Sequence, residues 1–316
     1  MLVDGFVATD TPPLKLLKNC ELIASLNRGV IPPLHVQFNP TNRCNLSCSF
    51  CSCARRDRSA EADFSLFPQV LAGFVRLGTR ALTFTGGGEP LLHPNLNDMV
   101  WECHRADVKT GLITNGIALS SLESPTTWCR VSHADYRPFT DEYADQLALA
   151  IHRLSTVDWA FSYVVSAEPN LEQIQRVVRF ARDHGMTHVR LADDILAQRP
   201  APWAEVARVL HGVDSQVIYQ PRQPPHPGGD CYLCYLKPLI DCDYRWYACC
   251  TVQYALATPS LNNPPELCLG SSLDAERITS GSLTPFNGHH CAHCRYGEYN
   301  RALARLIQPV VHPEFL

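Results

Sequence analysis

The sequence NRCNLSCSFC, residues 42–51, places three cysteines in a CxxxCxxC spacing directly after an apolar run at residues 34–38. Such a run is typical of a buried strand, so Cys44, Cys48 and Cys51 follow the carboxyl end of a predicted strand. Thiolates are soft anionic ligands that suit iron in sulfide clusters. Three of them on a short loop can hold three irons of a [4Fe–4S] cluster, which leaves the fourth iron open to a small molecule.

Two further motifs lie at the ends of strand-like runs. TFTGGGEP occupies residues 83–90, and ITNG occupies residues 113–116. Around them, apolar periodicity predicts alternating strands and helices, which indicates parallel βαβ units. Right-handed crossovers would curl the six strands up to residue 192 into a barrel or partial barrel. The predicted strands span 34–38, 80–85, 108–114, 127–132, 158–165 and 187–192, and the helices 66–77, 95–106, 140–155 and 171–184.

These motifs, in this order over residues 30–195, resemble the radical S-adenosylmethionine (SAM) superfamily. The resemblance implies a partial (β/α)6 barrel and a [4Fe–4S] cluster held by Cys44, Cys48 and Cys51. It implies that the open iron chelates the amino and carboxylate groups of SAM. Reductive cleavage would then give a 5′-deoxyadenosyl radical that abstracts hydrogen from a substrate, with electrons from an external donor of the flavodoxin or ferredoxin type.

The resemblance also implies a set of SAM contacts. Phe50 precedes the last cysteine, where the family places an aromatic residue beside the adenine. Gly87, Gly88 and Glu89 form the segment that binds the SAM ammonium, with glycines that allow close backbone approach. Ser132 of an RxS-like triplet, Asn115, and Leu191 complete the candidates, although a strand end and a core leucine are equally ordinary roles. Cys53 falls outside the register and is expected beside the cluster.

The second cysteine-rich region follows a Pro- and Gly-rich stretch at residues 221–229, where a domain boundary is expected. It resembles the SPASM/twitch extension of radical SAM enzymes: a cysteine, two strands around a turn, a doubled cysteine and a closing CxxC pair. Tyr244 occupies a turn position where that extension usually has glycine. The resemblance implies one auxiliary [4Fe–4S] cluster with ligands Cys231, Cys249, Cys291 and Cys294, and with Cys234 and Cys250 as alternates.

A zinc site is the alternative for this region, because two CxxC pairs can bind zinc with four thiolates. Cys234 and Cys291 are separated by 56 residues, more than a zinc ribbon usually has, and the Cys249–Cys250 pair would stay unexplained. The predicted units are therefore an N-terminal arm and helix (1–29), the barrel (30–222) and an auxiliary-cluster domain with a last helix (229–316).

Composition limits the expected cellular location and the classes of binding partner. The chain has 316 residues, fifteen cysteines and a formal net charge of −4. The N-terminus lacks a signal-peptide pattern and no apolar run reaches a membrane-spanning length, so we expect a cytoplasmic protein that uses clustered cysteines for metal. The charge gives no bulk reason to bind nucleic acid or an anionic membrane. The single cysteines Cys20, Cys103 and Cys129 are expected to be buried.

The predicted function is hydrogen abstraction from a small-molecule or peptide substrate, with the auxiliary cluster aiding oxidation or substrate positioning. Asp193 and Asp194, after the sixth strand, are candidates for substrate binding or a base, or alternatively for a helix N-cap. Residues 55–58, RRDR, are interpreted as a solvated loop rather than a substrate-facing basic edge. Two alternatives stay open: a radical SAM enzyme that modifies tRNA or DNA bases, and a non-catalytic iron–sulfur or zinc sensor.

Overall fold

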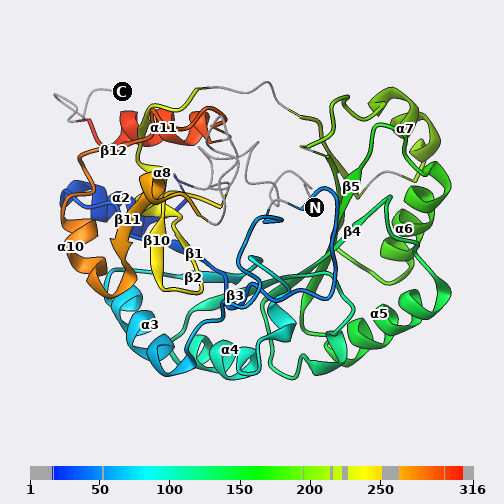
Figure 1. The fold of residues 1–316 in the computed structure, drawn as a ribbon, viewed down its shortest axis with the longest axis horizontal. Helices are drawn as coiled ribbons and strands as arrows, with labels where there is room; N and C mark the ends of the chain where they lie inside the picture. The colour runs from blue at the N-terminus through cyan, green and yellow to red at the C-terminus, as the bar shows by residue number, and fades with distance from the viewer. Residues whose placement is uncertain are drawn as a thin grey trace.

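One curved sheet organises the molecule (Figure 1). The computed structural model describes residues 16, 18–51, 53–194, 196–213, 216–222, 227–250, 263–294 and 296–308. Within them, ten strands form one sheet in the order β11-β10-β9-β1-β2-β3-β4-β5-β6-β7, and β1 to β7 are all parallel. The seven parallel strands are β1 (His35–Phe38), β2 (Ala81–Phe84), β3 (Lys109–Thr114), β4 (Trp128–Ala134), β5 (Asp158–Val165), β6 (His188–Asp193) and β7 (Val217–Gln220).

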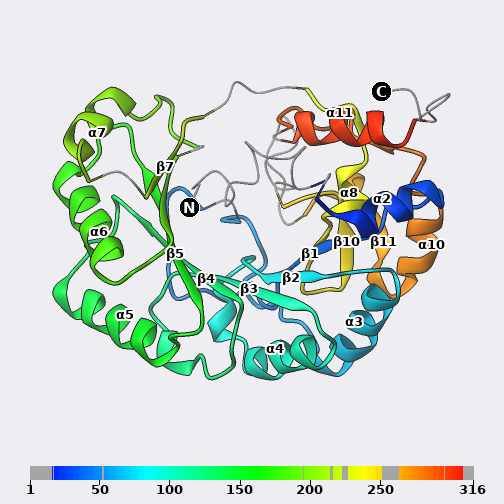
Figure 2. The same ribbon diagram turned by 180° about the vertical axis from the view of Figure 1, so that it is seen from behind.

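Helices follow the strands and cover the outer face of the sheet, as both ribbon views show (Figure 2). Two of them begin at side-chain caps that accept free backbone N–H groups: Thr140 caps α5 and Asn170 caps α6. The predicted partial α/β barrel is confirmed, with boundaries within a few residues of the expected ones. The helices are α3 (Phe67–Arg76), α4 (Leu96–Arg105), α5 (Asp141–Arg153), α6 (Leu171–Asp183) and α7 (Trp203–Leu210), with short 3-10 turns at η2 (Phe64–Leu66), η3 (Pro90–Leu92) and η4 (Leu119–Ser121).

Strand alternation divides the sheet into two chemically different faces. Phe38, Phe84 and Phe161 are fully buried and belong to the core that the helices cover. Their neighbours point to the opposite, inner face, because successive side chains in a strand alternate. This inner face is polar in places: His35 hydrogen-bonds Thr83 across β1 and β2, with 2.8 Å between Nε2 and Oγ1. The inner face is therefore where a barrel of this type can bind a ligand.

The cysteine-rich segment extends the barrel sheet. β9 (Leu239–Ile240) pairs in parallel with β1, β10 (Arg245–Tyr247) returns antiparallel, and β11 (Cys268–Ser271) follows. Tyr244 makes the turn with φ of +58°, the left-handed region that normally favours glycine. Its buried side chain is anchored by a 2.6 Å bond from its hydroxyl to the Asp63 carbonyl oxygen. The remaining elements are β8 (Asp230–Cys231), α8 (Leu233–Leu236), η5 (Pro265–Leu267), η6 (Ser272–Asp274), α10 (Ala275–Ser280), β12 (Phe286–Asn287) and α11 (Gly297–Leu306).

The N-terminal helix is interrupted, and one cysteine prediction is wrong. The apolar spacing predicts a helix over residues 14–27, but Lys18 and Asn19 are not helical and α2 spans Cys20–Asn27. Residues 14, 15 and 17 lie outside the described residues. Asn19 caps α2 by accepting the Leu22 N–H at 3.0 Å, which restarts the helical period. Leu22 and Leu26 face the core, so Cys20 is exposed rather than buried. Cys103 and Cys129 are buried, as expected.

Among the described residues, no helix is long and apolar enough to cross a membrane.

Candidate active site

The three cysteines of the first motif lie together on the loop after β1. Cys44, Cys48 and Cys51 are all partly exposed and none is in a disulfide. Burial raises the pKa of Cys48, and the neighbouring Cys51 and Cys44 raise it further. The positive charges of Arg137 and Arg56 act in the opposite direction. Three thiols on one loop supply the donor set of a [4Fe–4S] cluster with one open iron.

Arg56 supports this loop from inside the fold. The residue is only 7% exposed, so the prediction of a solvated loop at residues 55–58 is wrong for this position. Its Nε donates to the Asn42 carbonyl oxygen at 2.9 Å, and its guanidinium also reaches the Cys53 carbonyl oxygen and, at 3.4 Å, Cys51 Sγ. Arg56 therefore fixes the loop around the cysteines and places an N–H donor beside the Cys51 sulfur.

The glycines after β2 pack directly against the start of the cysteine loop. The Gly88 N–H donates to the Thr41 carbonyl oxygen at 2.8 Å, and the Glu89 N–H donates to the Arg43 carbonyl oxygen at 2.7 Å. A Cβ on Gly87 would overlap the Asn42 side chain, and one on Gly88 would overlap the Arg43 carbonyl oxygen. These glycines therefore allow the close approach of another loop of the same chain, and any contact with SAM would come in addition.

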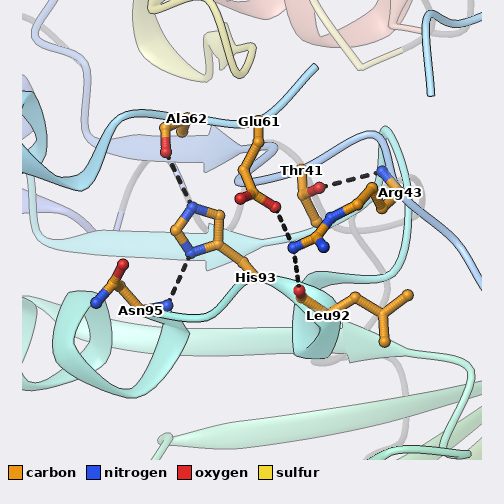
Figure 3. Close-up of polar contacts among 7 residues, drawn as sticks. All are labelled: Thr41, Arg43, Glu61, Ala62, Leu92, His93 and Asn95. Carbon is orange, nitrogen blue, oxygen red and sulfur yellow. Dashed lines mark hydrogen bonds and ion pairs between the residues drawn. The ribbon is translucent and has the colours of Figure 1, made fainter. Parts of the chain in front are cut away.

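Arg43 ties the same loop to the segments on either side of it (Figure 3). Its guanidinium pairs with Glu61 and donates to the Leu92 carbonyl oxygen at 2.7 Å. Its backbone N–H donates to Thr41 Oγ1 at 3.1 Å. The loop is therefore fixed at its base before its cysteines begin.

A buried histidine completes the contacts drawn in Figure 3. His93 Nδ1 accepts the Asn95 N–H at 3.1 Å, and Nε2 lies 3.0 Å from the Ala62 carbonyl oxygen. Because Nδ1 is an acceptor, Nε2 carries the proton and donates it to that carbonyl. His93 is thus a neutral structural link between the GGE segment and the segment after the cysteines.

Glu89 joins the second motif to the third. Its fully buried carboxylate accepts the Thr114 hydroxyl at 2.7 Å, the Asn115 N–H at 2.7 Å and the Leu91 N–H at 3.2 Å. Burial raises its pKa, while these hydrogen bonds lower it. Both oxygens of Glu89 are therefore engaged in fixing the GGE and TNG segments against each other.

Asn115 lies at the centre of a second group of contacts. Its Nδ2 donates to Asn45 Oδ1 of the cysteine loop at 2.7 Å. Its carbonyl oxygen accepts from Arg137 Nη1 at 2.9 Å and from the Tyr143 hydroxyl at 2.8 Å. Arg137 also donates to the Ser132 carbonyl oxygen at 3.3 Å, so the end of β4 joins the same group. Asn45, Asn115 and the strand end of Ser132 are thereby brought together, as the motif order predicts.

Phe50 lies beside a second aromatic ring. It stacks on Tyr136 with 5.8 Å between ring centroids and 21° between the planes. Tyr136 is 53% exposed, and its hydroxyl donates to Asp194 Oδ2 at 3.0 Å. Phe50, Tyr136 and Asp194 therefore form a chain of contacts from the cysteine loop to the end of β6.

Leu191 and Asp193, the other candidates at β6, make contacts within the folded chain. Leu191 is fully buried in the core under the helices, which favours its packing role over an adenine contact. Asp193 accepts the Ala201 N–H at 2.7 Å, the Arg222 N–H at 2.7 Å and the Trp203 indole N–H at 3.1 Å. Its carboxylate is thus occupied by loop backbone, and the N-cap position of α7 is Pro202, not an aspartate.

The four cysteines proposed for the auxiliary site line one cavity. A cavity of about 30 Å³ that opens to solvent lies between the β8 region and the closing CxxC pair. Gly228 and Gly288 approach it where a Cβ would overlap neighbouring backbone. Burial raises the pKa of Cys291 to about 11, whereas hydrogen bonds from the Cys234 and Asn300 side chains help lower that of Cys231 to about 7. The lining includes Cys231, Cys249, Cys291, Cys294, His293, Tyr296 and Asn300.

The alternates Cys234 and Cys250 lie outside this lining. Cys234 is fully buried and its Sγ–H donates to the Cys231 carbonyl oxygen at 3.3 Å. Cys250 Sγ lies 3.2 Å from the Tyr296 hydroxyl. Within the described residues, no three His, Cys, Asp or Glu side chains are arranged to hold a single metal ion. The donor chemistry of four thiols around one cavity fits an iron–sulfur cluster.

Comparison with known proteins identifies the barrel. The Radical SAM superfamily model matches residues 38–210, more than half of the chain. The chain belongs to the radical SAM superfamily. Membership implies a [4Fe–4S] cluster and SAM as the cofactors of the first cysteine loop.

Curated relatives match parts of the chain. It is 27% identical over 179 residues to the PqqA peptide cyclase of Gluconobacter oxydans, which is 51% of this chain and 49% of that protein. It is 38% identical over 87 residues to GTP 3′,8-cyclase 2 of Mycobacterium tuberculosis, which is 25% of this chain and 24% of that one. The PqqA cyclase match thus spans about half the length of that relative.

Solved structures share the fold. SuiB of Streptococcus suis bound to the precursor peptide SuiA has a TM-score of 0.57 at 16% identity, over 78% of this chain and 67% of SuiB. Native anSMEcpe with bound AdoMet and the Cp18Cys peptide has a TM-score of 0.55 at 14% identity, over 90% of this chain and 85% of that one. The fold likeness to anSMEcpe therefore extends into the cysteine-rich segment.

Three site residues were not among the sequence-based candidates: Arg56, Arg137 and Tyr136. Arg56 was assigned to the solvent because it lies in a run of charges. Arg137 and Tyr136 follow β4, a strand end that the motif argument had already placed at the site. Their position after Ser132 was a usable signal, whereas nothing in the RRDR run singles out its second arginine.

Proposed function

We propose that this protein is a radical SAM enzyme that modifies a peptide, with a second [4Fe–4S] cluster bound by Cys231, Cys249, Cys291 and Cys294. The observation that carries the proposal is the presence of two cysteine sets on one sheet. One set follows β1, and the other surrounds a cavity in the segment joined to β1 through β9. The PqqA peptide cyclase relative supports a peptide as the substrate class.

When bound, the cluster and SAM supply one-electron cleavage to a 5′-deoxyadenosyl radical, and the chain provides the binding and orientation. Cys44, Cys48 and Cys51 would hold the cluster, with Arg56 fixing the loop that carries Cys51. Phe50 and Tyr136 would offer flat faces to the adenine. The backbone around Gly87 and the Asn115 side chain would receive the polar part of SAM, since Glu89 holds these two segments in a fixed relation.

The second cysteine set would act on the substrate side. Four cysteines saturate a cluster, so this one would have no open iron. Such a cluster can accept an electron from the substrate after hydrogen abstraction, which suits a net oxidation or a bond-forming modification. The electron donor for the first cluster would be a separate flavodoxin- or ferredoxin-type protein.

Metal analysis of anaerobically reconstituted protein tests the two-cluster assignment. We expect roughly eight irons and eight sulfides per chain, and roughly four in the Cys231→Ala, Cys291→Ala double variant. Cys268→Ala is the matched control, because Cys268 is partly exposed and outside both sets. Four irons with one zinc in the wild type would overturn the auxiliary cluster in favour of a structural zinc site.

Product analysis tests the activity. Reduced wild-type protein should release 5′-deoxyadenosine from SAM, and Cys48→Ala should release none. Candidate peptides should raise this release and change in mass. Wild-type protein that carries the first cluster but never cleaves SAM would overturn the enzymatic function and favour a non-catalytic iron–sulfur protein.

A further inference from the structure

Two arginines project from the inner face of the barrel. Arg130 lies in the middle of β4 and Arg190 in β6, with β5 between them. Both occupy positions that alternate with fully buried core residues such as Val131 and Leu191, so their side chains point away from the helices. The charge of Arg190 is close enough to lower the pKa of Arg130, after the larger effect of burial.

No acidic side chain of the described residues balances this pair. Arg190 donates twice to Ser162 Oγ, at 2.7 Å and 3.2 Å, and serine is neutral. Arg130 lies over the Trp128 ring at 5.7 Å, and its buried Nε has no hydrogen-bond partner in the described part of the chain. His188 faces the same two charges, which with burial lower its pKa to about 4. A guanidinium stays protonated, so two like charges lie close together with no acidic partner among the described residues.

The groups opposite the arginines come from the cysteine-rich segment. Both arginines lie within electrostatic reach of Tyr296 and Cys250, whose side chains meet at 3.2 Å. Tyr296 also lines the four-cysteine cavity. Tyr296 is therefore a neighbour both of the arginine pair and of that cavity.

We propose that Arg130 and Arg190 together bind an anionic group of the substrate, a carboxylate or a phosphate. The anion would lie on the inner face of the sheet, near Cys250 and Tyr296. Guanidinium groups present paired N–H donors that match both anions in a bidentate geometry. The anion would balance the two guanidinium charges and give Arg130 Nε an acceptor. The proposal deepens the proposed function, since it names the chemical feature by which this site selects its substrate.

Direct titration tests the anion site without turnover. The probes are glutarate and inorganic phosphate, with neutral glutaramide for comparison, added at constant ionic strength to the reconstituted protein. Calorimetry measures affinity, and the shift in melting temperature reports binding independently. We expect saturable binding of an anion in wild type, and a loss of about ten- to a hundredfold in affinity for Arg130→Gln and for Arg190→Gln.

Matched variants make the result specific. Arg182→Gln, on the exposed side of α6, should bind like wild type. Arg190→Lys keeps the charge without the paired donors and should bind between wild type and Arg190→Gln. Arg130→Gln and Arg190→Gln are measured separately, so if one of them fails to fold, the other still tests the anion site.

The outcomes separate the possibilities. Tighter binding of glutarate assigns an acidic peptide, and tighter binding of phosphate assigns a phosphorylated substrate. Equal affinity in Arg182→Gln and Arg190→Gln, or no saturable binding by wild type in the millimolar range, overturns the anion site. Because the titration needs no SAM cleavage, such a result in a protein that does cleave SAM counts against the anion site alone.

Discussion

Replacing Glu89 with glutamine should weaken the link between the GGE and TNG segments. The amide keeps the size of the carboxylate but replaces one acceptor oxygen with an NH2 donor. Glu89 Oε2 accepts the Asn115 N–H, and Oε1 accepts the Thr114 hydroxyl and the Leu91 N–H. The Thr114 oxygen already accepts the Gly116 N–H at 3.0 Å. Whichever way the amide turns, at least one buried backbone N–H loses its acceptor.

The magnitude follows from the balance of two terms. A buried donor without a partner costs about 1–3 kcal/mol, and a hydrogen bond to a charged acceptor contributes about 1.5–3 kcal/mol. The variant also no longer buries a charge, which offsets part of this loss. We therefore expect the free energy of unfolding to fall by about 2 kcal/mol.

Urea unfolding at pH 7 measures the global effect, and hydrogen exchange of the Asn115 and Leu91 amides measures the local one. At least one of these two amides should exchange faster in Glu89→Gln. Glu61→Gln is the control, because the Glu61–Arg43 pair is exposed and such pairs contribute at most about 1 kcal/mol. A Glu89→Gln protein as stable as Glu61→Gln, with unchanged exchange at both amides, would refute the reasoning.

Three further changes test other parts of the structure. Arg56→Gln should retain less iron than wild type after reconstitution and desalting, whereas Arg58→Gln, an exposed neighbour, should retain the same amount. Gly88→Ala should destabilise the fold by about 2 kcal/mol or more through overlap with backbone, while Gly281→Ala, which has no atom within 4 Å of its new Cβ, should be neutral in thermal melts. Burial and a neighbouring arginine lower the pKa of His133 to about 3, below the unfolded value of about 6.5, so its contribution is complete above pH 6.5 and falls as the pH decreases. Wild type should therefore lose about 2 kcal/mol more than His133→Phe between pH 7 and pH 5, and equal losses in urea titrations would contradict this linkage.

The sequence contained enough to place the barrel strands and the order of the motifs at their ends. Periodicity predicts which residues alternate, and the parallel topology then brings the ends of β1, β2, β3 and β4 to one edge. The sequence did not show which atoms each side chain would contact. Gly88 was interpreted as making room for a ligand, and the structure shows that it makes room for the Arg43 carbonyl oxygen.

Side chains in charged or apolar runs were the least predictable. Arg56 and Arg58 have nearly the same local sequence, yet only Arg56 is buried, because the loop folds back on Asn42. Cys20 fits an apolar helical face, but the cap at Asn19 shifts where the helix begins. In both cases a contact distant from the periodic pattern decides the outcome.

The doubled cysteine shows what a hairpin adds to a motif. Spacing alone left Cys249 and Cys250 as alternative ligands. The β9–β10 hairpin, turned at Tyr244, sends Cys249 to the cavity lining and Cys250 to Tyr296. The assignment of cluster ligands itself stays a prediction until metal is measured.

The pairing of β1 with β9 has a consequence for how the chain is made. β1 gains β2 as a neighbour soon after synthesis, but its other neighbour, residues 239–240, leaves the ribosome some two hundred residues later. Until then β1 is an open sheet edge, and such edges pair readily with other chains. The loop that would bind the first cluster thus follows a strand whose second neighbour is synthesised late. We expect nascent chains that end before residue 239 to aggregate and to load iron poorly.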